Sequence, residues 1–162
     1  MSTLITNTIQ GVQNIKYDAS TTAMTIDSSG RVLKPVIPFG QASSNAKTTA
    51  TNIVNLNTHV ISGGGVTVDQ TNNRMVVPVT GLYQIGFTEL TDVAAYVEII
   101  MRKNGSNING ARAQTGTSHQ YGEFGHHMLI SLAANDYIDW YCQAGTTHNN
   151  SEYNNHYVYL IG

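Results

Sequence analysis

The stretch VPVTGLYQIGF, residues 77–87, decides the fold. Its first half is typical of a turn, and after Gly81 the apolar residues Tyr83, Ile85 and Phe87 alternate with polar or small ones. A period of two places alternate side chains on opposite faces of a β-strand. The stretch therefore predicts a strand that begins at Gly81 and has one buried face.

The same alternation recurs along the chain, so we expect an all-β protein. Residues 96–103 alternate in this way and end at Asn104-Gly105, a pair suited to a type I′ hairpin turn. Further alternating runs lie at residues 128–132, 138–142 and 157–160. About eight to ten such strands without a helical period predict an antiparallel β-sandwich or jelly roll.

Composition excludes several classes of function. Only 11% of the 162 residues are charged and the net charge is −2, so no basic surface is available for nucleic acid. No segment approaches 18 consecutive apolar residues, and the first ten residues lack the pattern of a signal peptide. We expect neither nucleic-acid binding nor membrane insertion.

Catalytic and metal-binding patterns are also missing, so we expect no enzyme activity and no cofactor. His126 and His127 are adjacent and point to opposite faces of a strand, and no metalloprotease motif or Cys pair occurs. A metal shared by three copies on a symmetry axis stays open. The single Cys142 is predicted to be a small buried hydrophobe, and Asp136 to accept backbone hydrogen bonds in a turn.

The first 35 residues differ from the rest, so we expect two parts: an arm at 1–35 and a main domain at 36–162. Within the arm, Ser28-Ser29-Gly30 separates two short runs, 24–27 and 31–34, which predicts a small hairpin. A lone hairpin is marginally stable, so the arm is predicted to need a partner surface. The predicted anchoring residues are Leu4, Ile5, Ile9, Val12 and Ile15.

Two polar loops, residues 115–121 and 144–156, are candidate ligand sites. The second contains His148, Tyr153 and His156 among several asparagines. Such side chains hydrogen-bond hydroxyl groups, and an aromatic ring stacks on a sugar, so host surface glycans are possible ligands. The alternative is a solvated loop that joins two strands.

Four motifs together resemble the C1q and tumour-necrosis-factor-like jelly-roll superfamily over about residues 36–162. They are VPVTGLYQIGF at 77–87, YVEIIMRKNGS at 96–106, LISLAANDYIDWYC at 129–142 and YVYLIG at 157–162. The opening MSTLITNTIQ followed by MTIDSSGRVLKP is similar to that of small virion proteins of tailed bacteriophages, cyanophages especially. The resemblance implies an antiparallel jelly-roll β-sandwich with an extended N-terminal arm.

The resemblance also implies a function. It suggests a homotrimeric virion protein that is assembled in the host cytoplasm and fastened by its arm to other virion proteins such as the major capsid protein. A tail-fibre knob that binds host glycans is the alternative, while the lack of collagen repeats and disulfides argues against a cellular secreted protein. Six residues are predicted to lie either in the core or at the trimer interface, and the sequence does not decide between the two for any of them. They are Tyr83, Ile85, Phe87, Trp140, Tyr157 and Tyr159.

Overall fold

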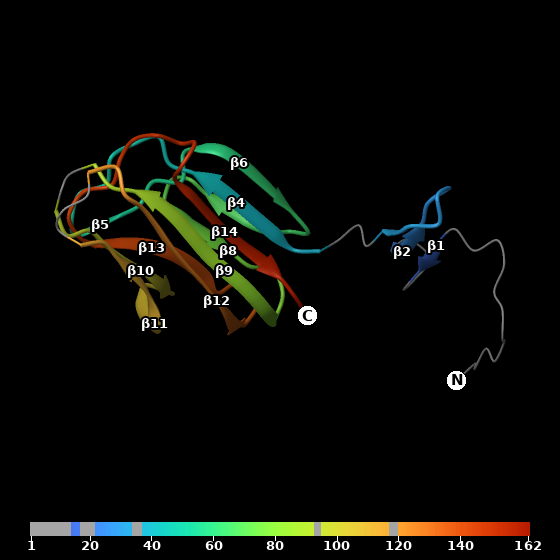
Figure 1. Cartoon of the computed structure of the whole chain (residues 1–162). Helices are drawn as coiled ribbons and strands as arrows, with labels where there is room; N and C mark the ends of the chain where they lie inside the picture. Colours follow the sequence, from blue (N-terminus) through green and yellow to red (C-terminus); the bar gives the residue numbers. More distant parts are fainter. Residues whose placement is uncertain (1–13, 17–21, 34–36, 93–94, 117–119) are drawn as a thin grey trace. The chain divides into compact units, whose positions relative to one another are not determined.

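The structure is a computed structural model that describes residues 14–16, 22–33, 37–92, 95–116 and 120–162. The chain divides into two compact units, Met1–Ile37 and Pro38–Gly162. The regular secondary structure of the described ranges consists of β-strands (Figure 1). The all-β class predicted from the alternation is therefore confirmed.

A small antiparallel sheet forms the described part of the first unit. Its strands are β1 (Asn14–Lys16), β2 (Thr22–Ile26) and β3 (Val32–Leu33), in the order β1-β2-β3. Between β2 and β3, the Asp27 carboxylate accepts backbone hydrogen bonds from Ser29 and Arg31, and Gly30 has a φ of +77°. Glycine adopts this φ without steric cost. The predicted hairpin is thus confirmed.

Most of the anchoring residues predicted for the arm lie outside the described part of the chain. Leu4, Ile5, Ile9 and Val12 lie outside the described residues. Ile15 lies in β1, where it is opposite Met24 of β2. The third strand, β1, was not predicted, because a three-residue strand is too short to show an alternation.

Two antiparallel sheets pack face to face in the second unit and form a β-sandwich (Figure 1). The five-stranded sheet has the order β12-β9-β14-β4-β6. Its strands are β4 (Phe39–Ser43), β6 (Thr58–Gly63), β9 (Gly81–Leu90), β12 (Glu123–Leu132) and β14 (Asn155–Leu160).

The six-stranded sheet has the order β11-β10-β13-β8-β7, and β5 pairs with β13 outside this path. Its strands are β5 (Asn52–Ile53), β7 (Thr67–Asp69), β8 (Arg74–Val76), β10 (Glu98–Lys103), β11 (Ser106–Gln114) and β13 (Tyr137–Ala144). Both sheets are therefore assembled from strands that lie far apart in the sequence.

The eight strands β4 and β8 to β14 pair in a nested order. The first pairs with the last, β4 with β14, and the second with the second-last, β8 with β13. The third pairs with β12 and the fourth with β11. This arrangement is that of a long hairpin folded over on itself, and it brings the ends of the domain together in the five-stranded sheet.

The core lies between the sheets and contains the residues that the alternation predicted. From β9, Tyr83, Ile85 and Phe87 point inward and are at most 2% exposed. They meet the inward residues of β10 and β13, namely Ile99, Met101, Ile138, Trp140 and Cys142. Burial raises the pKa of the Cys142 thiol to about 12, so this cysteine is an unreactive core residue, as expected.

Two predicted turns are confirmed in detail. Asn104 and Gly105 have φ values of +51° and +77°, and a type I′ turn requires positive φ at both positions. Asp136 accepts a backbone hydrogen bond from Ala133 at 2.7 Å and pairs with Lys103 at 2.7 Å. These contacts, the Lys103 hydrogen bond first, lower the pKa of the Asp136 carboxyl.

Other boundaries differ from the expectation. The first strand of the sandwich, β4, covers Phe39–Ser43 and so begins three residues after the expected start of the main domain at residue 36. Pro38 lacks the N–H that a strand residue donates, so pairing begins after it. The strand β11 was not predicted, because it is a largely exposed edge strand whose sequence, SNINGARAQ, shows little alternation.

Candidate functional site

The outer side of the five-stranded sheet carries a continuous set of apolar side chains, which we call the aromatic face. It comprises Phe39 of β4, Ile61 of β6, Leu82 of β9, Leu129 of β12, Tyr157 and Tyr159 of β14, and Ile161 beyond it. Alternation explains the positions on β4, β9, β12 and β14, because the strand neighbours of these residues point into the core. On β6 the neighbours of Ile61 are exposed as well.

The strand register makes these residues neighbours. Gln84 of β9 is opposite Leu129 on one side and Tyr159 on the other, and Tyr159 is opposite Phe39. In the next row, Tyr157 lies between Gly86 of β9 and Gln41 of β4, and Gln41 is opposite Ile61. Two rows of side chains therefore cross four or five strands.

Two glycines allow the rings to lie close to the sheet. A Cβ atom at Gly86 would lie 2.6 Å from the Tyr157 hydroxyl oxygen, and one at Gly63 would collide with the Phe39 ring. The Gln84 side-chain amide donates a hydrogen bond to the Tyr157 hydroxyl at 3.4 Å. Between these rings lies a shallow hollow of about 260 Å³, lined by Phe39, Gln84, Tyr157, Tyr159 and their neighbours.

Charge is nearly missing from the aromatic face. Among the described outward positions of its five strands, the only charged residue is Glu123, which begins β12. Leu129 is 55% exposed, Ile61 54% and Tyr159 42%. Exposed apolar side chains that gather on one uncharged surface usually mark an interaction site. The aromatic face is thus suited to bury itself against another protein surface.

The structure divides the six residues predicted for the core or the interface. Tyr83, Ile85, Phe87 and Trp140 belong to the core, while Tyr157 is half-buried and Tyr159 exposed on the aromatic face. The other residues of this face, Phe39, Ile61, Leu82, Leu129 and Ile161, were not predicted. For Leu82 and Leu129, the available signal was an apolar residue at a position that alternation assigns to the outside.

The two candidate ligand loops meet at one point. The Tyr121 ring contacts the His148 ring edge to face, with 5.3 Å between the ring centroids. Tyr153 is exposed, and residues 117–119 of the first loop lie outside the described residues. His148 is half-buried beside Tyr121, and the role of His148 and Tyr153 in ligand binding stays a prediction.

His156 does not belong to this loop. It lies in β14, is fully buried, and packs between Phe87 and Trp140 at centroid distances of 6.4 and 5.0 Å. Its prediction as a ligand residue was therefore wrong, because a ligand cannot reach it. The polar sequence around His156 concealed the inward orientation that the β14 alternation gives it.

A second buried group explains why a histidine occupies this position. Glu89 of β9 is also fully buried, and its Oε1 lies 2.9 Å from His156 Nε2. The two side chains are in close contact without the alignment of a hydrogen bond, since none of their four polar atoms has a partner with hydrogen-bond geometry. Burial raises the pKa of the Glu89 carboxyl, and His156 lowers it by a smaller amount.

Metal-binding and membrane features were searched in the same ranges. Among the described residues, no group of three or more His, Cys, Asp or Glu side chains is placed to hold a metal ion. His126 points inward and His127 outward, as the alternation predicted. Within the described part of the chain, no helix has the length and apolar character to span a membrane.

The chain matches no protein-family model, and no curated protein matches it significantly.

Proposed function

We propose that this chain is a structural virion protein of a tailed bacteriophage: a homotrimer that decorates or cements the capsid, or forms a head fibre. The role is mechanical and needs neither cofactor nor catalysis. The aromatic face is the observation that carries the proposal, because an uncharged apolar surface of this kind is stabilised when copies of the chain cover it.

The fine form of the sandwich that we propose is a C1q/TNF-like jelly roll. The nested pairing of β4 with β14, β8 with β13, β9 with β12 and β10 with β11 supports it, since a jelly roll consists of eight strands in two sheets. The four sequence motifs that resemble this superfamily lie in these strands and their turns.

The trimer forms through the aromatic face in this proposal. Tyrosine suits such an interface, because the ring buries a large apolar area and the hydroxyl tolerates water at the rim. Tyr157 and Tyr159 lie on β14 near the centre of the face, Tyr159 between Gln84 and Phe39 and Tyr157 between Gly86 and Gln41. The neighbours on their own sheet are uncharged, so no unpaired charge is buried when copies associate.

The arm, residues 1–35, fastens the trimer to other virion proteins such as the major capsid protein. Its described part is a three-stranded sheet with strands of two to five residues. Sheets this small are marginally stable alone and gain stability from a partner surface. If it is extended, an arm of this length spans about 100 Å at about 3.3 Å per residue, enough to reach a neighbouring subunit.

Binding to particles tests this function. We expect the full chain to bind purified particles that lack it, and a variant without residues 1–35 to stay trimeric but no longer bind. Protease should cleave the arm in the free protein and not in particles. Equal binding of both forms, or equal cleavage in both states, would remove the anchoring role.

A tail-fibre knob that recognises host glycans is the second candidate. The exposed Tyr121 and Tyr153 at the loop end favour it, because exposed aromatic rings stack on sugars. Particle micrographs with a labelled antibody separate the two roles. Hundreds of copies on the head support decoration, and a few copies at the tail support the receptor-binding knob.

A further inference from the structure

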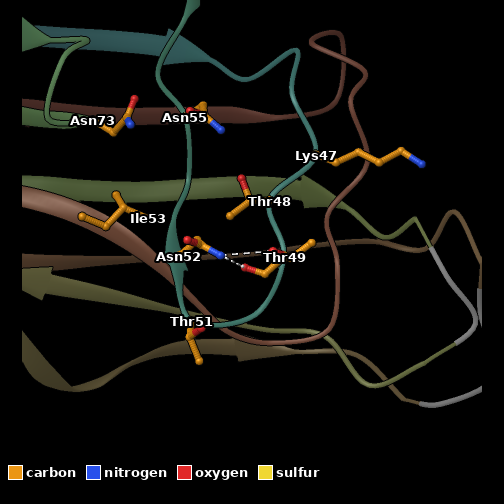
Figure 2. A pocket seen from close by; sticks show the side chains of 8 residues that line it. All are labelled: Lys47, Thr48, Thr49, Thr51, Asn52, Ile53, Asn55 and Asn73. Carbon is orange, nitrogen blue, oxygen red and sulfur yellow. Dashed lines mark hydrogen bonds between the residues drawn. The ribbon is translucent and has the colours of Figure 1, made fainter.

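A polar pocket of about 490 Å³ opens beside the six-stranded sheet and shares no residue with the aromatic face (Figure 2). It is lined by three threonines, three asparagines, one lysine and one isoleucine from residues 47–55 and Asn73. Small-molecule sites in proteins have volumes of about 300–1,000 Å³. The pocket is therefore large enough for one or two sugar rings.

Two asparagines of the lining are held in place by the protein itself. The Asn52 side-chain nitrogen donates to the Thr49 hydroxyl at 3.1 Å and to the Thr49 carbonyl at 3.3 Å (Figure 2). The Asn73 side-chain oxygen accepts the backbone N–H of Leu56 at 3.0 Å. Asn52 thus keeps an acceptor and Asn73 a donor for a ligand, and their fixed positions reduce the entropy cost of binding.

Three further polar groups of the lining lack a partner. No described residue hydrogen-bonds to the Asn55 amide or the Thr51 hydroxyl. The Thr48 hydroxyl is buried and has no hydrogen-bond partner among the described residues. An unpaired buried hydroxyl group costs free energy. A ligand that accepts a hydrogen bond from Thr48 would remove this cost without breaking an existing hydrogen bond.

The charge of the pocket selects against ionic ligands. Its one cation, Lys47, is paired with Asp92 at 2.6 Å, and none of the eight lining residues is acidic. The half-buried Ile53 adds an apolar wall beside the amides and hydroxyls. A pyranose ring has the matching chemistry, with hydroxyls at its edge and an apolar C–H surface on its face.

We propose that this pocket binds a neutral saccharide through Asn52, Asn55, Asn73 and Thr51, with Ile53 against the sugar ring. The site is formed by other residues than the loop with Tyr153, and it gives the chain a recognition activity beyond a structural role in the virion. Its lining residues differ from those of the aromatic face, so sugar binding and trimer formation are tested separately.

An immobilised panel of neutral and acidic oligosaccharides, probed with the full chain, tests the proposal. We expect saturable binding to neutral members, and a titration of the strongest one to give its affinity. Asn55→Ala and Thr51→Gly should each weaken that affinity about fivefold, and the double variant about 25-fold, as expected for one lost hydrogen bond each. Thr51 has a φ of +66°, which glycine adopts freely, so Thr51→Gly keeps the fold.

Tyr153→Ala serves as the matched control, since it removes an exposed side chain of the other candidate loop and should leave the affinity unchanged. The proposal is overturned by three results: no saturable binding, binding to acidic members only, or loss with Tyr153→Ala but not with Asn55→Ala. Light scattering on the same samples measures the oligomeric state, so the test of sugar binding can be distinguished from the test of the proposed trimer. If the protein is a monomer and still binds the sugar, the proposed trimer is refuted and the proposed saccharide site stands.

Discussion

The two outer faces of the sandwich differ in how their side chains are satisfied. On the six-stranded sheet, Arg102 pairs with Asp139 at 2.6 Å and its guanidinium lies 4.3 Å from the centre of the Tyr141 ring. Arg74 pairs with Asp69 and lies over the Tyr137 ring in the same way. On the five-stranded sheet the described outward side chains are uncharged except for Glu123 at the start of β12, and no described ion pair joins them.

The difference teaches which face needs a partner. Cations that cover tyrosine rings and pair with carboxylates complete the surface of the six-stranded sheet within one chain. No described cation covers the tyrosines of the aromatic face, so we infer that this apolar area is the one that another protein surface buries. Four described ion pairs thus belong to the six-stranded sheet and its turns, and none joins outward residues of the five-stranded sheet, which in our proposal serves assembly.

The largest expected effect comes from a charge on the aromatic face. Tyr159→Asp should dissociate the trimer, because the change occurs once in each copy and a buried central contact contributes about 2 kcal/mol or more per copy. The melting temperature of the monomer should change little. Tyr153→Asp is the matched control, since Tyr153 is 43% and Tyr159 42% exposed. Dissociation by both variants, or by neither, measured by light scattering, would break the comparison.

The next effect concerns the six-stranded face and should leave assembly intact. Arg102→Met leaves the Asp139 carboxylate, whose side chain is 3% exposed, without its ion-pair partner, and should destabilise the fold by about 3 kcal/mol. Lys47→Met removes an ion pair of the same 2.6 Å length whose lysine is half exposed, and should cost less than about 1 kcal/mol. If urea unfolding shows that both variants lose a similar unfolding free energy, burial does not determine how much each ion pair contributes.

The smallest effect lies between the faces, at Glu89. Burial raises the pKa of this carboxyl above its ordinary value of 4.5, so its contribution to stability is present below that pH and is lost as the pH rises through the raised pKa. Glu89→Gln cannot ionise, so the melting temperature of this variant relative to that of the wild type should rise between pH 4.5 and pH 8. His156 and Cys142 are the titratable groups nearest to this carboxyl.

The opposite trend at Glu89 would carry its own meaning. If the wild type gains stability over Glu89→Gln as the pH rises, the charge pairing with His156 outweighs the cost of burial. A difference that does not depend on pH would show that Glu89 ionises equally in the folded and unfolded chain.

Local pattern predicted most of the sandwich. The alternation in β9 gave its bounds and its inward residues, and the Asn104-Gly105 pair gave its turn, because both depend only on neighbours in the chain. The strand β11 could not be predicted, since an exposed edge strand needs no alternation. The nested pairing was not predicted, because pairing between distant strands leaves no signal in a single sequence.

The candidate site was predicted less well, for a related reason. Alternation shows that Tyr157 and Tyr159 share one side of a strand, but not whether this side faces the other sheet. Tyr83 and Trp140 therefore entered the same prediction as Tyr159, although they are core residues. His156 was misassigned because its partner, Glu89, lies on a strand far away in the sequence.

The mass of the wild-type protein in solution tests the central claim most directly. Light scattering at micromolar concentration should give three times the 17.5 kDa of one chain if three copies cover their aromatic faces together, as we propose. A mass of 17.5 kDa under the same conditions would mean that the aromatic face stays exposed, and it would contradict the account.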